Sequence, residues 1–191
     1  MRTAAATSAA VAAPSPTVFS PSNGPTTSGG SAAGAAVATG STVGDENAID
    51  YILAGFSDSG IAPKHIQFEI TETAEVKHLS EAKQLIGTLR SVGVSIALDD
   101  FGSGLSSFAY LKELPIDCLK IDSSFIHTME NSDVDYSVVS TINHLGHIMG
   151  VTTVAEGVEN ENQLRLLKKI GVDYLQGFLF QHPQPLDQIR R

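Results

Sequence analysis

Charged and amide side chains recur in this sequence at the ends of short apolar runs. Asp99 and Asp100 end one such run, Lys120 lies in the next, and Glu156 and Gln176 end two later ones. Carboxylate oxygens are the ligands that hard divalent cations take, and a lysine ammonium is a point charge that holds phosphate. The pattern therefore points to metal-dependent chemistry on a phosphorylated ligand.

The adjacent pair Asp99-Asp100 is the strongest single feature. Two neighbouring carboxylates at the end of a buried strand repel each other and lose hydration, and a cation between them would offset both costs. Mg²⁺ and Mn²⁺ prefer oxygen donors, so Glu72, Asp99, Asp100 and Glu156 form a plausible ligand set. The alternative is an N-cap for a helix that follows the turn 102–104, and capping explains one acid better than two.

Lys120 and Gln176 each allow more than one interpretation. An unpaired ammonium is costly in an apolar strand, so Lys120 needs a partner. It could hold a phosphate or an attacking water, form a Schiff base as lysine aldolases do, or make a structural ion pair with Asp122 or Asp99. Gln176 could orient a ligand oxygen or serve only the structure. The six histidines show no metal-ligand spacing.

The elements that carry these residues alternate between strand-like and helical patterns. Strands are predicted over 66–71, 94–98, 116–121, 151–155 and 172–175. Helices are predicted over 46–59, 80–90, 105–114, 133–149 and 160–170, with another beginning at 186. Such alternation indicates βα units and a parallel sheet, and a closed barrel of this kind has about eight strands. We therefore predict an α/β fold, a partial (β/α)8 TIM-like barrel of about five parallel strands with outer helices.

Composition divides the chain in two. Residues 1–44 are small and uncharged except for Arg2, which predicts a disordered low-complexity tail before a folded domain over 45–191. A targeting peptide is the alternative for the tail. The net charge of −9 argues against nucleic-acid binding, and no apolar run approaches the roughly 20 residues of a membrane span. The single cysteine, Cys118, excludes an internal disulfide and favours the cytoplasm.

Five ordered motifs resemble the C-terminal part of the EAL domain family, the bacterial phosphodiesterases of cyclic di-GMP. The motifs are Glu-Ile-Thr-Glu-Thr at 69–73, Leu-Asp-Asp-Phe-Gly-Ser-Gly-Leu-Ser-Ser at 98–107, Lys-Ile-Asp at 120–122, Ala-Glu-Gly-Val-Glu at 155–159 and Gln-Gly-Phe at 176–178. The resemblance implies a (β/α)8-like barrel that hydrolyses cyclic di-GMP to linear pGpG with Mg²⁺ or Mn²⁺.

The resemblance also implies roles for individual residues. The implied metal ligands are Glu72, Asp99, Asp100 and Glu156. By the same resemblance, Lys120 would assist the attacking water or the phosphate. Glu159 and Gln176 would complete the inner site, and Glu75 would support the loop after Asp100.

The sequence departs from the family pattern in one respect. The Glu-Ala-Leu segment that names the family and a metal-binding Asn on the following strand are both missing, and the segment 81–83 lies within a predicted helix and does not replace them. From this we expect a phosphodiesterase domain that is impaired in this chain. The alternative is a non-catalytic EAL remnant that binds a nucleotide or a protein; a lysine aldolase would not need so many carboxylates. An open barrel also predicts low stability, and a homodimer or other association through its exposed edge.

Overall fold

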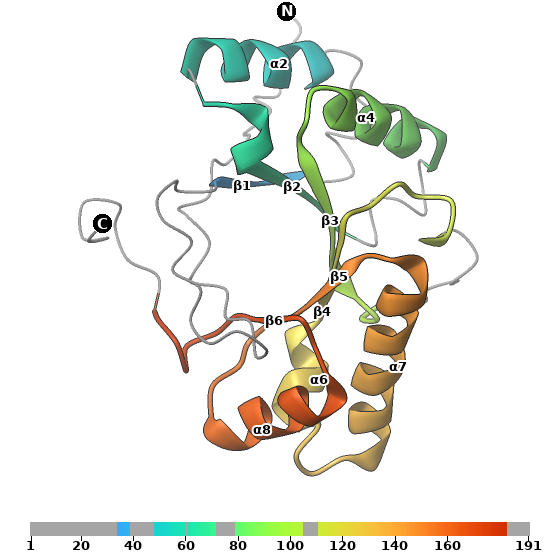
Figure 1. Ribbon diagram of the computed structural model, residues 1–191, viewed down its shortest axis with the longest axis vertical. Helices are drawn as coiled ribbons and strands as arrows, with labels where there is room; N and C mark the ends of the chain where they lie inside the picture. The colour runs from blue at the N-terminus through green and yellow to red at the C-terminus, as the bar shows by residue number, and fades with distance from the viewer. Residues whose placement is uncertain (1–33, 39–47, 60, 72–78, 105–110, 183–191) are drawn as a thin grey trace, which may run out of the picture.

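The computed structural model describes residues 34–38, 48–59, 61–71, 79–104 and 111–182 of the chain. Within these ranges the strands form one parallel sheet of six, in the sequential order β1 to β6. The strands are β1 Gly34–Ala38, β2 Ile66–Thr71, β3 Ser95–Phe101, β4 Cys118–Ile121, β5 Thr152–Ala155 and β6 Tyr174–Leu175. The sheet bends into an arc, and the helices lie along its outer side (Figure 1).

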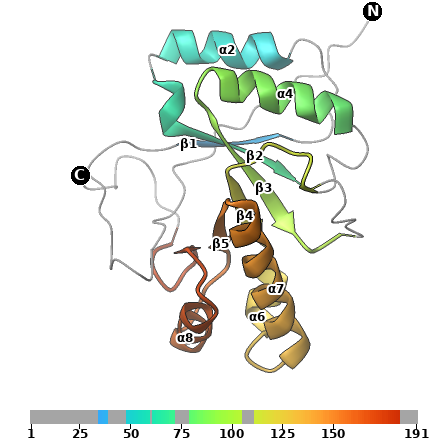
Figure 2. The ribbon, with the colours of Figure 1, turned by 45° about the vertical axis from the view of Figure 1, so that its right-hand side comes forward.

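Two groups of helices cover different parts of the arc. The helices are α2 Ala48–Ser59, α4 Leu79–Ser91, α6 Ser123–Thr128, α7 Asp133–Met149 and α8 Glu161–Ile170, with a short 3₁₀ helix at Pro63–His65. Helices α2 and α4 lie side by side near the first strands, whereas α6, α7 and α8 lie near the later ones (Figures 1 and 2). No helix in the described part of the chain combines the length and the apolar character that crossing a bilayer requires.

The sequence predictions agree with most of these elements. All five predicted strands are present as β2 to β6, within a few residues of the expected bounds. Strand β1 was not predicted: its residues 34–38 pair in parallel with β2, so the assignment of this stretch to a disordered tail is wrong. The rest of the proposed tail, most of the predicted helix 105–114 and the helix expected from 186 lie outside the described residues.

The sheet separates an apolar layer from a smaller inner face. Alternate side chains of the strands, such as Ile70, Leu98 and Leu119, are buried in one apolar core that also includes α4 residues such as Leu89. Because successive strand residues face opposite sides, the intervening positions form a different surface. On it a small separate cluster contains Ala97, Cys118 and Val154, packed with Tyr174. The charged residues lie at the end of this inner face where the strands have their C-terminal ends.

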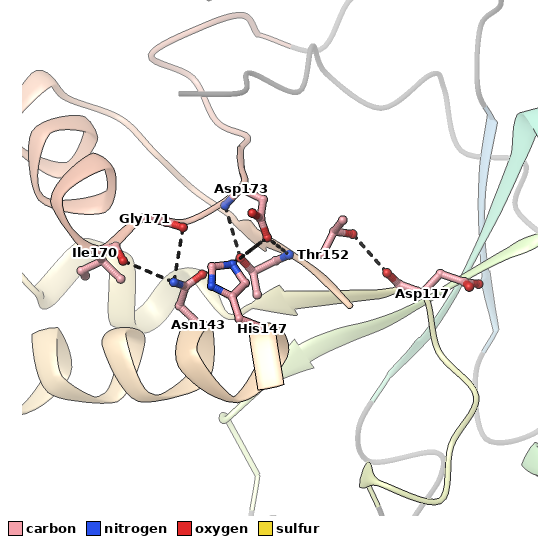
Figure 3. A network of polar contacts seen from close by, with 8 residues as sticks. Asp117, Asn143, His147, Thr152, Ile170, Gly171 and Asp173 are labelled. Carbon is pink, nitrogen blue, oxygen red and sulfur yellow. Dashed lines mark hydrogen bonds and ion pairs between the residues drawn. The ribbon is translucent and has the colours of Figure 1, made fainter. Parts of the chain in front are cut away.

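A buried polar network joins α7 to the N-terminal ends of β5 and β6 (Figure 3). The fully buried Thr153 donates its hydroxyl to Asn143 Oδ1 over 2.6 Å. Asp173 Oδ2 accepts a hydrogen bond from the Thr153 backbone N–H at 2.8 Å and lies 3.1 Å from His147 Nε2. Buried polar groups are costly without partners, so this network fixes α7 against the sheet. It lies at the opposite end of the strands from the charged residues, the end associated with stability in such barrels.

Replacing Thr153 with valine should therefore destabilise the fold. The change keeps the side-chain volume but leaves Asn143 Oδ1 without its buried donor, which should lower the free energy of unfolding by about 1–3 kcal/mol. Thr141→Val is the matched control, because Thr141 is exposed on α7 and its hydroxyl donates to the Ser137 carbonyl of the same helix. Urea denaturation of both variants tests this, and equal losses would contradict a specific role for the network.

Candidate active site

Lys120 is the centre of the charged cluster. Its Nζ lies 2.9 Å from Glu69 Oε1, 2.7 Å from Asp99 Oδ1 and 2.8 Å from Glu156 Oε1. The lysine is only 5% exposed. The four residues come from β2, β3, β4 and the segment immediately after β5. Parallel strands bring their C-terminal ends to one edge, which is where the active sites of (β/α) barrels are built.

A break in the strand register sets the Asp99-Asp100 pair. Between the pairs Leu98↔Leu119 and Phe101↔Ile121, β3 advances three residues while β4 advances two. Asp100 has a φ of 55°, a left-handed conformation that no other non-glycine residue shows in the described part of the chain. Successive residues of a regular strand face opposite sides, and a bulge re-aims one of them.

As a result both neighbouring carboxylates reach one site. Oxygens of Asp99, Asp100 and Glu156 all lie within 4.8 Å of one another. A left-handed residue costs roughly 1–2 kcal/mol for most side chains, and Asp is among the few that tolerate it. Such strain is typical of functional sites. The capping alternative for this pair remains untested, because the segment where that helix would begin lies outside the described residues.

Burial and mutual repulsion govern the protonation of the cluster. Burial raises the pKa of Glu156 to about 7; the Asp99 charge adds to this rise and Lys120 opposes it. Burial also raises the pKa of Asp100, as do the nearby charges of Asp99 and Asp122. Although burial disfavours its charge, Glu156, Asp99 and Glu69 hold the pKa of Lys120 above its usual range. The lysine is therefore a permanent cation among acids that hold excess negative charge.

This donor set fits a hard divalent cation. Its members offer carboxylate oxygens, the ligands that Mg²⁺, Mn²⁺ and Ca²⁺ prefer. Asp99 Oδ1 is buried and, apart from its ion pair with Lys120, no hydrogen-bond donor among the described residues points at it with good geometry. An added cation would satisfy such an oxygen and reduce the repulsion between the acids.

Glu159 and Gln176 lie on two loops that are bonded to each other. Past the ends of β5 and β6, the Val158 N–H donates to the Gln176 carbonyl at 3.0 Å and the Leu179 N–H donates to the Val158 carbonyl at 2.9 Å. Gly177 makes this approach possible, because a Cβ there would lie 2.2 Å from the Val158 backbone N and O. The loops are thus held in a fixed relation to each other.

The structure divides the predicted site residues into three sets. It brings Asp99, Asp100, Lys120 and Glu156 together. Glu159 lies outside this cluster, half-exposed, with its carboxylate 3.6 Å from His127 Nε2, and Gln176 follows β6 on the loop bonded to that of Val158. The predicted metal ligand Glu72 and the predicted loop support Glu75 are outside the described residues.

Glu69 is a member of the cluster that the sequence analysis did not select. It is buried in the middle of β2 and contacts Lys120 directly. Its sequence signal was a lone acid between Phe68 and Ile70, in a strand whose other face is apolar. The argument that a buried charge in a strand needs a partner, applied above to Lys120, would have found Glu69 too.

Comparison with known proteins identifies the fold. The sequence profile of the EAL domain matches residues 32–183. This chain belongs to the EAL domain family. The family match begins upstream of residue 45, in agreement with the place of β1 in the sheet.

Relatives of this EAL domain include proteins named as cyclic di-GMP phosphodiesterases. The cyclic di-GMP phosphodiesterase PdeB of Shewanella oneidensis is 39% identical over 148 residues, which cover 78% of this chain and 17% of PdeB. The bifunctional diguanylate cyclase/cyclic di-GMP phosphodiesterase MucR of Pseudomonas aeruginosa is 37% identical over 151 residues, covering 75% and 22%. The chain thus spans about a fifth of the length of these relatives.

Solved EAL structures share the same architecture. The PaMucR phosphodiesterase in complex with c-di-GMP superposes with a TM-score of 0.77 at 34% identity, covering 81% of this chain and 62% of that one. The manganese/cyclic di-GMP complex of Klebsiella pneumoniae BlrP1 gives 0.72 at 27% identity, covering 78% and 38%. The predicted α/β, TIM-like barrel fold is therefore confirmed.

The raised pKa of Glu156 leads to a prediction about stability in metal-free buffer. Its usual pKa is 4.5 and its folded value is about 7, so between these values the folded protein binds a proton that the unfolded chain has released. Stability should therefore fall as the pH rises through this window, by on the order of 2 kcal/mol from this group. Chemical denaturation in EDTA at several pH values measures the effect.

Glu156→Gln should flatten that part of the pH profile, since the amide cannot ionise. The control is Glu159→Gln, which removes a carboxylate from the same loop after β5, where the Glu159 side chain is 51% exposed. The control should keep the wild-type slope. A Glu156→Gln profile that is parallel to wild type would show that another group titrates in this window.

Proposed function

We propose that this EAL domain acts on cyclic di-GMP, hydrolysing it to linear pGpG with divalent cations. The observation that carries the proposal is the group of carboxylates around a buried lysine, contributed by β2, β3 and the segment directly after β5. Support comes from the identity with PdeB, a cyclic di-GMP phosphodiesterase, and from the fold shared with the c-di-GMP complex of PaMucR. We propose a cytoplasmic location, which the single cysteine favours.

The residues that would hold the cations are the carboxylates of the cluster. Asp99, Asp100 and Glu156 have oxygens close enough to share one ion, and Glu69 contacts the same lysine as Asp99 and Glu156 do. Glu72 stays a predicted ligand. The metals supply polarisation of the phosphodiester and a lower pKa for a bound water. BlrP1 has been solved with manganese, and Mg²⁺ or Mn²⁺ is our proposal for this chain.

The other site residues bind and orient the substrate. Lys120 presents a permanent positive charge beside the carboxylates, where it can attract a phosphate oxygen or orient the attacking water. Gln176 offers a side-chain amide directly after β6. The backbone hydrogen bonds that join its loop to Val158 fix the position of the Gln176 main chain. Glu159 lies on the partner loop and would complete the inner site. Glu75 stays a predicted support for the loop that follows Asp100.

We further propose that the 191-residue chain turns over slowly by itself. The sequence as it stands contains no Glu-Ala-Leu segment and therefore lacks one family carboxylate and one family amide. Catalysis by two metals requires both ions to be placed correctly, and a misplacement of about 1 Å can cost about 10²-fold in rate. Fusion to strands that carry the missing ligands should restore the rate.

Chromatographic detection of pGpG tests the proposal. We expect slow, Mn²⁺- or Mg²⁺-dependent product formation by the chain and a rate about 10²-fold higher in a fusion with the missing strands of PdeB. Asp99→Asn should remove Mn²⁺ binding and turnover in both forms, because it deletes charge at the centre of the cluster. Asp135→Asn, a change in the first turn of α7, should alter neither. Rapid turnover by the short chain would contradict the proposed impairment. A fusion that forms no pGpG would contradict the proposed phosphodiesterase activity.

A non-catalytic EAL remnant is the second candidate. The absent ligands favour it, while the retained cluster could still bind the nucleotide. The two candidates differ in one observable: the remnant binds cyclic di-GMP in calorimetry and releases no pGpG even when fused to the missing strands.

We also propose that the isolated chain associates through its sheet edges. Among the described residues β1 pairs only with β2, and β6 pairs only with β5. Unpaired strand edges are templates for pairing with another chain. Sedimentation velocity should show a concentration-dependent dimer or larger species, whereas a monomer at every concentration would count against edge pairing.

A further inference from the structure

We propose that Lys120 is a built-in counter-ion, which allows the site to fold without a metal and competes with the divalent cation for the same carboxylates. The inference rests on the metal binding put forward above and adds a second role for the lysine, separate from any contact with substrate. The proposal makes Lys120 a positioning residue for the carboxylates and a determinant of metal affinity.

The contacts of the ammonium carry the first half of the inference. Each of its three carboxylate partners belongs to a different strand or strand end, at 2.7–2.9 Å from Nζ. The side chains of Glu69, Asp99 and Glu156 are themselves only 10–17% exposed. Removing one partner of a buried ion pair leaves an uncompensated charge in a poor solvent for ions. Without the ammonium, three acids from three strands would face one another.

The overlap between two sets of oxygens carries the second half. Asp99 and Glu156 contact the ammonium and also belong, with Asp100, to the group whose oxygens lie within 4.8 Å of one another. A cation held by those oxygens therefore draws on the same charges that Lys120 neutralises. Like charges close together repel strongly at low dielectric. The lysine must then weaken the binding of the cation, while its absence would leave the carboxylates free to hold the metal alone.

The strand arrangement explains why such a counter-ion is useful. Lys120 lies on β4, between β3 and β5, so its ammonium reaches acids on both neighbouring elements and on β2 beyond. A chain that had to capture a metal before these four elements could come together would fold only in its presence, as many small metal-binding domains do. Lys120 removes that requirement, at the cost of affinity for the cation.

Lys120→Met is the central variant, because methionine keeps much of the side-chain volume and removes the charge. We expect it to unfold at a much lower urea concentration than wild type in EDTA, and to recover wild-type resistance in saturating Mn²⁺. Its Mn²⁺ affinity, measured by calorimetry on the folded protein, should exceed that of wild type by roughly tenfold or more, the scale on which neighbouring groups change metal affinity.

The matched control is Lys83→Met. Lys83 pairs with Glu113 on the surface, where both side chains are more than a third exposed, so this change removes a lysine charge away from the cluster. The control should match wild type in both buffers, with the wild-type urea midpoint in EDTA and the wild-type rise in that midpoint on adding Mn²⁺. A double variant, Lys120→Met with Glu156→Gln, removes one of the repelling acids and should regain part of the stability in EDTA.

Several outcomes would overturn the inference. It fails if Lys120→Met is as stable as wild type in EDTA, if it remains unfolded in saturating Mn²⁺, or if folded Lys120→Met binds Mn²⁺ no more tightly than wild type does. Those results leave the phosphodiesterase proposal standing, since wild type would still bind the metal. A wild-type chain that binds no Mn²⁺ contradicts both proposals at once.

Discussion

A buried positive charge is the constraint around which the C-terminal end of this sheet is built. An ammonium removed from water needs close anionic partners, and Lys120 finds them on β2, on β3 and directly after β5. The sheet order allows this, because sequential parallel strands place those three elements around β4. The same requirement gathers carboxylates at the one edge where a barrel fold binds its substrate. Fold stability and the proposed metal binding therefore depend on the same few atoms.

The backbone around the cluster has irregular features that close packing alone does not require. The register break in β3 and the left-handed Asp100 bring two adjacent acids to one side, where they repel each other. Beyond the next strands, Gly177 allows two loops to bond backbone to backbone. Strain and repulsion of this kind persist in proteins when a bound ligand uses them. At the opposite end of the sheet, by contrast, the polar groups around Thr153 are paired by hydrogen bonds.

The sequence predicted the parts of this molecule that follow local rules. Alternating apolar runs located β2 to β6, and the strand-end rule located Asp99, Lys120 and Glu156. Strand β1 was missed because its Gly-Ala-Ala-Val-Ala sequence has little strand propensity and is ordered by pairing with β2. The helix α6 was missed because six residues capped by Asp122 leave too short a pattern to detect. Which carboxylate meets which charge depends on register across strands, and the sequence does not encode that locally.

The most direct test of the account is a crystal structure of the chain grown with Mn²⁺ and measured at a wavelength where manganese scatters anomalously. The account predicts an anomalous peak among the carboxylates of Asp99, Asp100 and Glu156, with the Lys120 ammonium moved away from at least one of its present partners. An anomalous map without a peak at these carboxylates, or a peak there with all three ion pairs of Lys120 unchanged, would contradict it.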